Sequence, residues 1–248
     1  MLIKIFSASD EGDEATFVIE TIQSHIYEDY KKNEIAILYR SNAQSRVFEE
    51  KLIMKAVILA GGLGTRISEY TKTIPKPMIK VCGKPIIQRI IDHYYKYGFK
   101  NFYIALGYKG QVIKDYFKKK KLNKDLKINL IETGRNTMTG GRLKKLKKFL
   151  DKTFLLTYGD GLSNLNLRKL VKFHKENKKL ITLTAVRPPA RFGVIKIKGK
   201  IVQYFREKNS LDAGWINGGF FVVEPKFINL IKGDKTYLEQ EPFKLVTK

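Results

Sequence analysis

The feature that most constrains the fold of this chain is a short apolar run followed directly by a glycine-rich turn. Residues 55–60 read Lys-Ala-Val-Ile-Leu-Ala, and residues 61–64 read Gly-Gly-Leu-Gly. A continuous apolar run of this length is typical of a parallel strand buried on both faces, and parallel strands need helical crossovers. The pair predicts a sheet covered by helices, with a glycine loop after its first strand.

The rest of the chain alternates between strand and helix patterns. Apolar residues at helical spacing predict helices over residues 86–95, 111–119, 142–150 and 167–175. Short apolar runs predict strands over residues 101–106, 127–132, 154–158, 180–186 and 219–223. Two further strand patterns flank Lys198-Gly199-Lys200 and predict a hairpin over residues 194–205. The fold class that follows is a Rossmann-like α/β sheet with mixed strand directions.

Charge divides the chain at Met54. The whole sequence has 48 basic and 24 acidic residues, a net charge of +24. Residues 1–53 contain 6 basic and 10 acidic residues, a net of −4, which leaves 42 and 14, a net of +28, for residues 54–248. This step predicts two segments of different origin. Because 38 of the basic residues are lysine and only 10 are arginine, a solvated surface is favoured over a polyanion site, and nucleic acid is not expected as a partner.

Composition also excludes several classes of site and of protein. Cys82 is the only cysteine, which excludes disulfides and multi-thiolate metal sites and favours a cytoplasmic setting. No apolar stretch approaches the roughly 18 residues of a membrane span, so no membrane partner is expected. Assembly into a homo-oligomer is left open by the sequence.

The glycine-rich turn is a candidate phosphate site. Gly61, Gly62 and Gly64 let the backbone bring its N–H groups close to an anion, and Thr65 and Arg66 follow at once. It is neither a Walker A loop, which needs Gly-Lys-Ser/Thr, nor the dinucleotide fingerprint, which needs a third glycine. A structural turn without a ligand is the alternative.

A second candidate is Lys76, which stands between Pro75 and Pro77 ten residues after Arg66. Each proline fixes a backbone angle, so the lysine is presented with little conformational freedom to lose. Asp160 follows the predicted strand 154–158 and is a suitable carboxylate for Mg²⁺.

From Met54 onward the chain resembles the sugar-1-phosphate nucleotidyltransferases, and among them the glucose-1-phosphate cytidylyltransferases. The resemblance is carried by the motifs Gly-Gly-Leu-Gly-Thr-Arg (61–66), Pro-Lys-Pro-Met (75–78), Glu-Thr-Gly (132–134), Thr-Met-Thr-Gly-Gly-Arg-Leu (137–143), Thr-Tyr-Gly-Asp-Gly (157–161) and Ile-Asn-Gly-Gly-Phe-Phe (216–221). It implies the nucleotide-diphospho-sugar transferase fold. It also implies transfer of CMP from CTP to glucose-1-phosphate with Mg²⁺ as cofactor, so that the partners are CTP and a sugar-1-phosphate.

The resemblance also implies a role for individual residues. The expected nucleotide ligands are Leu59, Ala60, Gly61, Gly62, Leu63, Gly64, Thr65, Arg66, Lys76, Thr137, Gly141, Arg142 and Gly159. The expected sugar-phosphate ligands are Glu207, Lys208, Asn217 and Gly218. Arg66, Lys76 and Asp160 would act at the reacting phosphate, and Asp160 would bind the metal.

Three departures from the family pattern are visible. Asn209 replaces a proline, the stretch between Phe117 and Thr133 is short, and the family's second Mg²⁺-binding aspartate has no counterpart, since Asp234 lies in a different turn. Weak or absent turnover is therefore expected. Related reactions with another nucleotide or sugar, or an inactive nucleotide- or nucleic-acid-binding fusion, are the alternatives.

Residues 1–53 resemble a fragment of the second RecA-like domain of UvrD-type DNA helicases. The resemblance covers Asp-Glu-Gly-Asp-Glu-Ala (10–15) and the stretch 33–46. A helix over 15–27, a strand over 34–39 and a helix over 45–53 are predicted, a short α/β fragment without a Walker loop. Helicase activity is not expected, and a fusion or a docking appendage is the interpretation.

Overall fold

The computed structural model describes residues 17–18, 21–22, 25, 54–64, 73–188, 194–206 and 214–247. Its contacts divide the chain into two units, Met1–Met54 and Lys55–Lys248. In the first unit residues 17–18, 21–22 and 25 are helical, within the helix predicted over 15–27. The predicted strand over 34–39 and helix over 45–53 lie outside the described residues.

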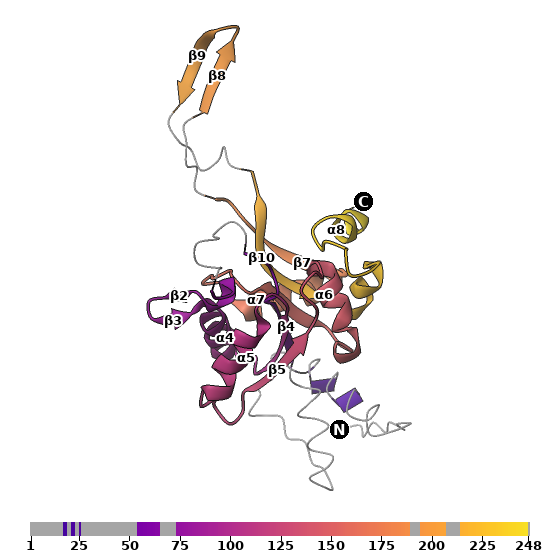
Figure 1. Ribbon diagram of the computed structural model, residues 1–248. Helices are drawn as coiled ribbons and strands as arrows, with labels where there is room; N and C mark the ends of the chain where they lie inside the picture. Colours follow the sequence, from indigo (N-terminus) through magenta and orange to yellow (C-terminus); the bar gives the residue numbers. More distant parts are fainter. Residues whose placement is uncertain are drawn as a thin grey trace. The chain divides into compact units, whose positions relative to one another are not determined.

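The second unit contains a six-stranded sheet with the strand order β5-β4-β1-β6-β10-β7 (Figure 1). Its strands are β1 (Lys55–Leu59), β4 (Asn101–Leu106), β5 (Lys127–Glu132), β6 (Phe154–Tyr158), β7 (Ile181–Val186) and β10 (Ile216–Val223). β1 pairs in parallel with β4 and β6, and β4 with β5, whereas β10 is antiparallel to β6 and β7. The predicted Rossmann-like sheet with mixed strand directions is confirmed.

Two small hairpins form sheets of their own. β2 (Lys80–Val81) and β3 (Lys84–Pro85) are joined by Cys82 and Gly83, which both have positive φ, 47° and 80°, as a two-residue type I′ turn requires. No strand was predicted there because each of the two strands has only two residues. β8 (Val194–Lys198) and β9 (Ile201–Arg206) form the hairpin predicted over 194–205.

Helices cover both faces of the six-stranded sheet (Figure 1). They are α4 (Ile86–Lys96), α5 (Gly110–Lys119), α6 (Thr139–Lys145), α7 (Leu167–Asn177) and α8 (Glu241–Val246), with 3-10 turns η3 (Lys76–Met78), η4 (Lys147–Phe149) and η5 (Pro225–Leu230). In the described part of the chain, no helix is both long and apolar enough to cross a membrane.

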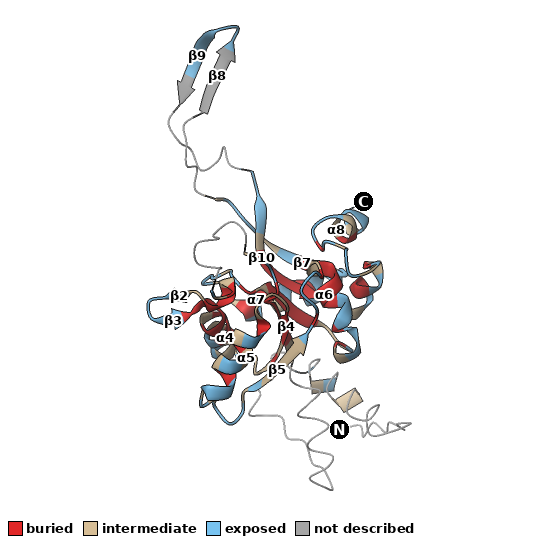
Figure 2. Cartoon of the chain, in the orientation of Figure 1, coloured by how far each residue is buried: buried red, intermediate tan, exposed pale blue. Residues whose placement is uncertain are grey.

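The central strands are buried (Figure 2), and because successive side chains of a strand point to opposite faces, they supply a core on each side of the sheet. On one side Leu156 of β6 and Phe221 of β10 belong to a buried cluster with Leu143 of α6 and Phe227 of η5. On the opposite side the ring of Tyr94 in α4 packs edge-on against Phe102 of β4, with centroids 6.1 Å apart. Each such buried side chain contributes about 1.5–3 kcal/mol of transfer free energy. The strands that carry the candidate site are therefore held firmly from both sides.

Three element predictions were wrong or incomplete. The helix predicted over 142–150 begins earlier, at Thr139, and ends at Lys145, followed by η4. The early start was missed because Gly140 and Gly141 are poor helix formers, but their N–H groups both donate to the Thr236 carbonyl. β10 begins at Ile216, whereas the predicted strand began at 219. Its first residues were missed because an irregularity between Asn217 and Phe221 interrupts the strand pattern. The short elements η5 and α8 were not predicted.

Candidate functional site

The carboxyl ends of β1, β4, β5 and β6 lie at one edge of the sheet because these strands are parallel. Main-chain hydrogen bonds continue beyond the strands: Ala60 N–H donates to Ala105 O (3.0 Å) and Gly159 N–H donates to Leu59 O (2.9 Å). In sheets of this class ligands bind at this edge. The segments that follow the strands are therefore the place to look for the predicted site residues.

The glycine loop follows β1 directly. Leu59, Ala60 and Gly61 are buried, whereas Gly62 and Leu63 are exposed. An added Cβ at Gly62 would have no other heavy atom within 4 Å, so this part of the backbone is open to a ligand. Gly64 has a φ of 68°, a conformation that favours glycine. Of the predicted ligands here, Thr65 and Arg66 lie outside the described residues.

Lys76 and Asp160 form an ion pair between Nζ and Oδ2. The lysine belongs to η3 and the aspartate follows β6, and their side chains are 34% and 35% exposed. Two motifs that are 84 residues apart in the sequence therefore meet at the predicted edge of the sheet. Because both groups are partly exposed, an incoming phosphate or cation can reach them.

Gly159 explains how the two motifs come so close. A Cβ at this position would lie 2.9 Å from Cγ of Pro77 and 3.0 Å from the carbonyl oxygen of Leu59. Neither atom can move away easily, because one is in a proline ring and the other accepts the Gly159 N–H. Glycine at this position thus lets η3, β1 and β6 converge.

Arg142 of α6 is buried, with 3% exposure, and its guanidinium bridges the ends of three strands. Nη2 donates to Gly61 O at 2.8 Å. Nη1 donates to Leu106 O at 3.0 Å, to Thr133 Oγ1 at 2.7 Å and to Gly134 O at 2.7 Å. Burial lowers the pKa of this guanidinium, although an arginine remains charged. These donors support the glycine loop from inside the protein, and contact between Arg142 and the nucleotide stays a prediction.

Gly141 is also engaged within the chain. Its N–H donates to Thr236 O at 3.3 Å, and a Cβ there would lie 2.5 Å from Asp234 O. The N–H of Met138 donates to the same Asp234 oxygen at 2.8 Å. The start of α6 is thus joined to residues 234–236, and contact between Gly141 and the nucleotide stays a prediction.

Thr137 is buried beside these groups. Lys145 donates from Nζ to Thr137 Oγ1 (3.3 Å) and to Thr133 O (3.0 Å), and it forms an ion pair with Asp234 at 2.6 Å. This pairing keeps the carboxylate of Asp234 in a turn that packs on α6. Whether Asp234 takes part in metal binding stays a prediction.

The predicted sugar-phosphate residues are only partly described. Asn217 lies in β10, and its Nδ2 donates to the hydroxyl of Tyr158 at 3.5 Å, while its Oδ1 accepts the Gly219 N–H at 2.8 Å. Gly218 lies at the irregularity of β10 beside β7. Glu207 and Lys208 lie outside the described residues.

Sequence reasoning missed three polar residues that the fold brings to this edge. Tyr158, at the end of β6, donates to Glu239 Oε1 at 2.5 Å, and Thr139 Oγ1 donates to Glu239 Oε2 at 2.8 Å. Burial, followed by the hydrogen bond to Glu239, raises the pKa of the Tyr158 phenol. The available signals were the motifs 157–161 and 137–143, which contain Tyr158 and Thr139. Glu239 gave no signal, because it is 81 residues farther along the chain than Tyr158.

The acidic residues here set the metal chemistry that is available. Among the residues that the structure describes, no group of three or more His, Cys, Asp or Glu side chains could hold a metal ion. Asp160 offers a single, partly exposed carboxylate next to an open loop. This arrangement fits a cation such as Mg²⁺, which commonly takes one or two carboxylates together with phosphate oxygens.

Comparison with protein families gives two matches. The nucleotidyl transferase family model matches residues 55–245, and the UvrD-like helicase C-terminal domain model matches residues 2–80. The two matches overlap over residues 55–80, a range that includes β1, residues 61–64 of the glycine loop and η3.

Individual proteins are similar over about three quarters of the chain. The chain is 45% identical over 211 residues to the glucose-1-phosphate cytidylyltransferase of Salmonella typhimurium, which covers 76% of this chain and 82% of the relative. It is 43% identical over 216 residues to the probable glucose-1-phosphate cytidylyltransferase of Bacillus subtilis, with 79% and 85% covered. The crystal structure of HddC from Yersinia pseudotuberculosis complexed with GMP-PN is similar with a TM-score of 0.60 and 27% identity, and 76% of this chain and 84% of that chain are covered.

Proposed function

The chain belongs to the nucleotidyl transferase family, and from this premise we propose that it transfers CMP from CTP to glucose-1-phosphate. The products are CDP-glucose and pyrophosphate. The single observation that carries this proposal is that Lys76 and Asp160 meet beside the open glycine loop. The identity of 43–45% to relatives named for this reaction supports the choice of nucleotide and sugar.

The reaction needs no nucleophile from the protein. A phosphate oxygen of glucose-1-phosphate attacks the α-phosphorus of CTP, a new P–O bond forms, and the bond to pyrophosphate breaks. The protein must hold two polyanions in line and offset the charge on the reacting phosphate. A glycine loop with Gly62 and Leu63 exposed and a partly exposed lysine are suited to that task.

Each residue contributes in a way that follows from its position. The N–H groups around Gly62 would bind the triphosphate where no Cβ obstructs it, and Lys76 would donate to oxygens of the reacting phosphate. Thr65 and Arg66 are proposed to extend the loop's phosphate contacts. Asp160 would hold Mg²⁺, which supplies positive charge to the phosphate oxygens when bound.

The other predicted ligands are proposed as follows. Leu59 and Ala60 hold the glycine loop, and Gly159 holds the approach of η3. Thr137, Gly141 and Arg142 are proposed to form the wall of the nucleotide site on the side of α6. Glu207, Lys208, Asn217 and Gly218 are proposed to bind the sugar phosphate.

We also propose that the transferase domain comprises residues 54–248 and that residues 1–53 are a separate helicase-like segment. The division of contacts after Met54 and the start of the nucleotidyl transferase match at residue 55 support this boundary, and the UvrD-like match supports the helicase-like character of the first segment. Expression of residues 54–248 alone tests it: a cooperative unfolding transition with the same midpoint as the full chain is expected. If residues 54–248 alone showed no cooperative unfolding transition, the proposed boundary would be contradicted.

The reaction is tested by supplying Mg²⁺, glucose-1-phosphate and each of CTP, UTP, GTP, ATP and dTTP in turn. Pyrophosphate release and the mass of the sugar nucleotide are measured. CTP is expected to give at least about tenfold more product than any other nucleotide. Preference for another nucleotide would replace CTP in the proposal, and absence of any sugar nucleotide would overturn it.

A further inference from the structure

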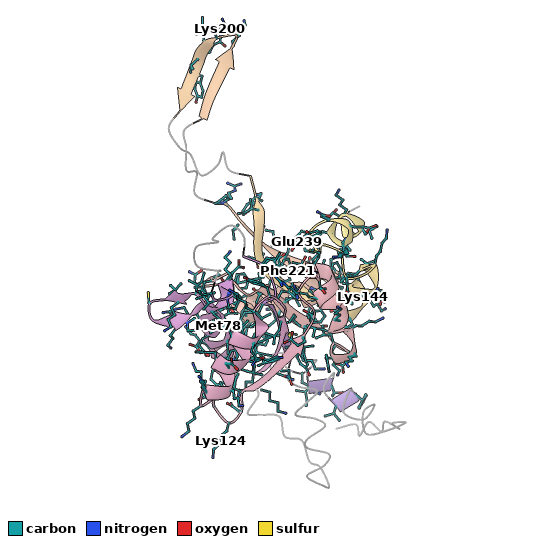
Figure 3. The ribbon with its side chains drawn as sticks, viewed as in Figure 1. Met78, Lys124, Lys144, Lys200, Phe221 and Glu239 are labelled. Atoms are coloured by element: carbon teal, nitrogen blue, oxygen red, sulfur yellow. The ribbon has the colours of Figure 1, made fainter. Side chains whose placement is uncertain are left out.

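Glu239 is held at the edge of the candidate site by residues from distant parts of the fold. Its carboxylate accepts the phenol of Tyr158 from β6 at 2.5 Å and the hydroxyl of Thr139 from α6 at 2.8 Å. Thr139 Oγ1 in turn accepts the N–H of Leu238 at 2.9 Å. Figure 3 labels Glu239 above α6, in the C-terminal part of the chain. The carboxylate is therefore fixed in position.

This fixed carboxylate still has acceptor capacity. An ionised carboxylate has about four acceptor sites, and the two hydrogen bonds use one on each oxygen. Glu239 is exposed, so a ligand can reach the remaining sites. Because the hydroxyls of Tyr158 and Thr139 already donate their hydrogen bonds to Glu239, the cluster offers acceptors to a ligand. It would therefore bind a group that donates hydrogen bonds.

The position of the cluster indicates which part of a ligand it meets. Tyr158 is directly followed by Gly159 and Asp160, so the cluster lies next to the proposed reacting centre. The amide of Asn217 reaches the same Tyr158 hydroxyl at 3.5 Å, which links the cluster to a proposed sugar residue. A carboxylate repels a phosphate, so Glu239 must face a neutral part of the substrates.

We infer that Glu239 accepts hydrogen bonds from hydroxyl groups of the sugar ring and helps to select the sugar. This inference rests on the proposed function. The sugar hydroxyls are neutral donors, and one carboxylate can accept from two of them. Tyr158 and Thr139 position the carboxylate and do not themselves need to touch the sugar.

The test compares Glu239→Gln with Glu241→Gln in the full chain. Glu241 is the matched control, because it lies two residues away and pairs with Lys232 at 2.5 Å instead of facing Tyr158. Calorimetry measures the affinity for CDP-glucose and for CDP. Loss of a charged acceptor is expected to weaken CDP-glucose binding about tenfold in Glu239→Gln, with CDP binding unchanged. Glu241→Gln should bind both like the wild type.

Deoxy analogues of glucose-1-phosphate provide a second test that uses the wild-type protein. The analogue that lacks the recognised hydroxyl should react with about a tenfold lower kcat/KM, and Glu239→Gln should show no further loss with that analogue. Because the substrate is changed here, the comparison is still informative if Glu239→Gln folds poorly.

Other outcomes would overturn the inference. Unchanged CDP-glucose affinity would show that Glu239 does not contact the sugar, and an equal loss for CDP would place it at the ribose or base. A shift in the Mg²⁺ dependence without a change in sugar affinity would make it a metal ligand. A wild-type protein that binds neither CDP nor CDP-glucose would instead contradict the proposed function.

Discussion

Two charged regions at the same edge of the sheet satisfy their charges in different ways. Lys76 and Asp160 pair with each other while about a third of each side chain is exposed, 34% and 35%. Arg142 is 3% exposed, and its guanidinium donates to main-chain carbonyls and a threonine hydroxyl. The first region can exchange its partners for a ligand, whereas the second has its partners inside the protein.

This difference suggests that the exposed pair serves to bind a ligand, whereas the buried guanidinium serves to support the fold. Water can replace the partner of a group in the exposed pair, so breaking the pair costs little folding free energy. Removal of the buried guanidinium would leave several carbonyl oxygens without a donor and without access to water, which is costly. We expect mutations in the first region to reduce activity and mutations in the second to reduce stability.

The largest expected effect is that of Arg142→Met. Loss of the buried donors should lower the free energy of unfolding by about 3–5 kcal/mol, because several buried acceptors remain unsatisfied. Urea denaturation followed by circular dichroism measures it. Arg142→Lys keeps the charge but not the planar fork, so it should fall between the wild type and Arg142→Met. A stability within about 1 kcal/mol of the wild type would remove the contrast between the two regions.

Asp160→Asn should show the opposite pattern. We expect kcat to fall about 10²–10³-fold, equivalent to about 2.7–4 kcal/mol of transition-state stabilisation, because the carboxylate proposed to hold Mg²⁺ at the reacting phosphate is lost. The free energy of unfolding should change by less than about 1 kcal/mol, since the pair with Lys76 is partly exposed. Steady-state kinetics and urea denaturation on the same preparation check both values. A large loss of stability with normal kcat would contradict the assignment.

Gly141→Ala tests how tightly the supporting region is packed. The added Cβ would lie 2.5 Å from the carbonyl oxygen of Asp234, so overpacking should cost about 1–3 kcal/mol. Gly62→Ala is the matched control for stability, because its Cβ would meet no other heavy atom within 4 Å. Thermal unfolding of both variants shows whether only the first is destabilised. Equal midpoints would indicate that residues 234–236 can move away from α6.

The smallest effect is expected for Lys84→Ala, which sets the baseline for both regions. Lys84 Nζ lies 3.4 Å from Asp92 Oδ2, and the two side chains are 60% and 46% exposed. Such a pair contributes about 0.5 kcal/mol or less, and added salt weakens it further. Urea denaturation at low and high salt measures the difference. A loss above about 1 kcal/mol would mean that exposed pairs here stabilise more than the comparison assumes.

Much of the fold could be read from local patterns. The apolar run at 55–60 predicted a buried parallel strand, and β1 is buried and pairs in parallel with β4 and β6. The helical spacing of Ile86, Ile87 and Tyr94 predicted α4, whose buried face contains these residues. Periodicity was informative here because each element packs one regular face. It failed at Gly140 and Gly141, where contacts with residues 234–236 override low helix propensity.

The candidate site was predictable only in part. Lys76 and Asp160 were identified one by one, from the two prolines and from the end of an apolar strand, and family resemblance predicted that they act together. Their contact depends on Gly159 and Pro77 packing closely, which no local pattern contains. Glu239 was not predicted at all, since an acidic residue in a polar stretch gives no signal until Thr139 and Tyr158 are beside it.

The sequence by itself determined the order of the main strands and helices along the chain, the glycine loop and the identity of the groups proposed to bind phosphate. These properties follow from local geometry and side-chain chemistry. Only the tertiary structure decided which of those groups are exposed and which are buried. It left Lys76 and Asp160 at a partly open edge and enclosed Arg142 among carbonyl oxygens, because burial depends on segments that are far apart in the chain.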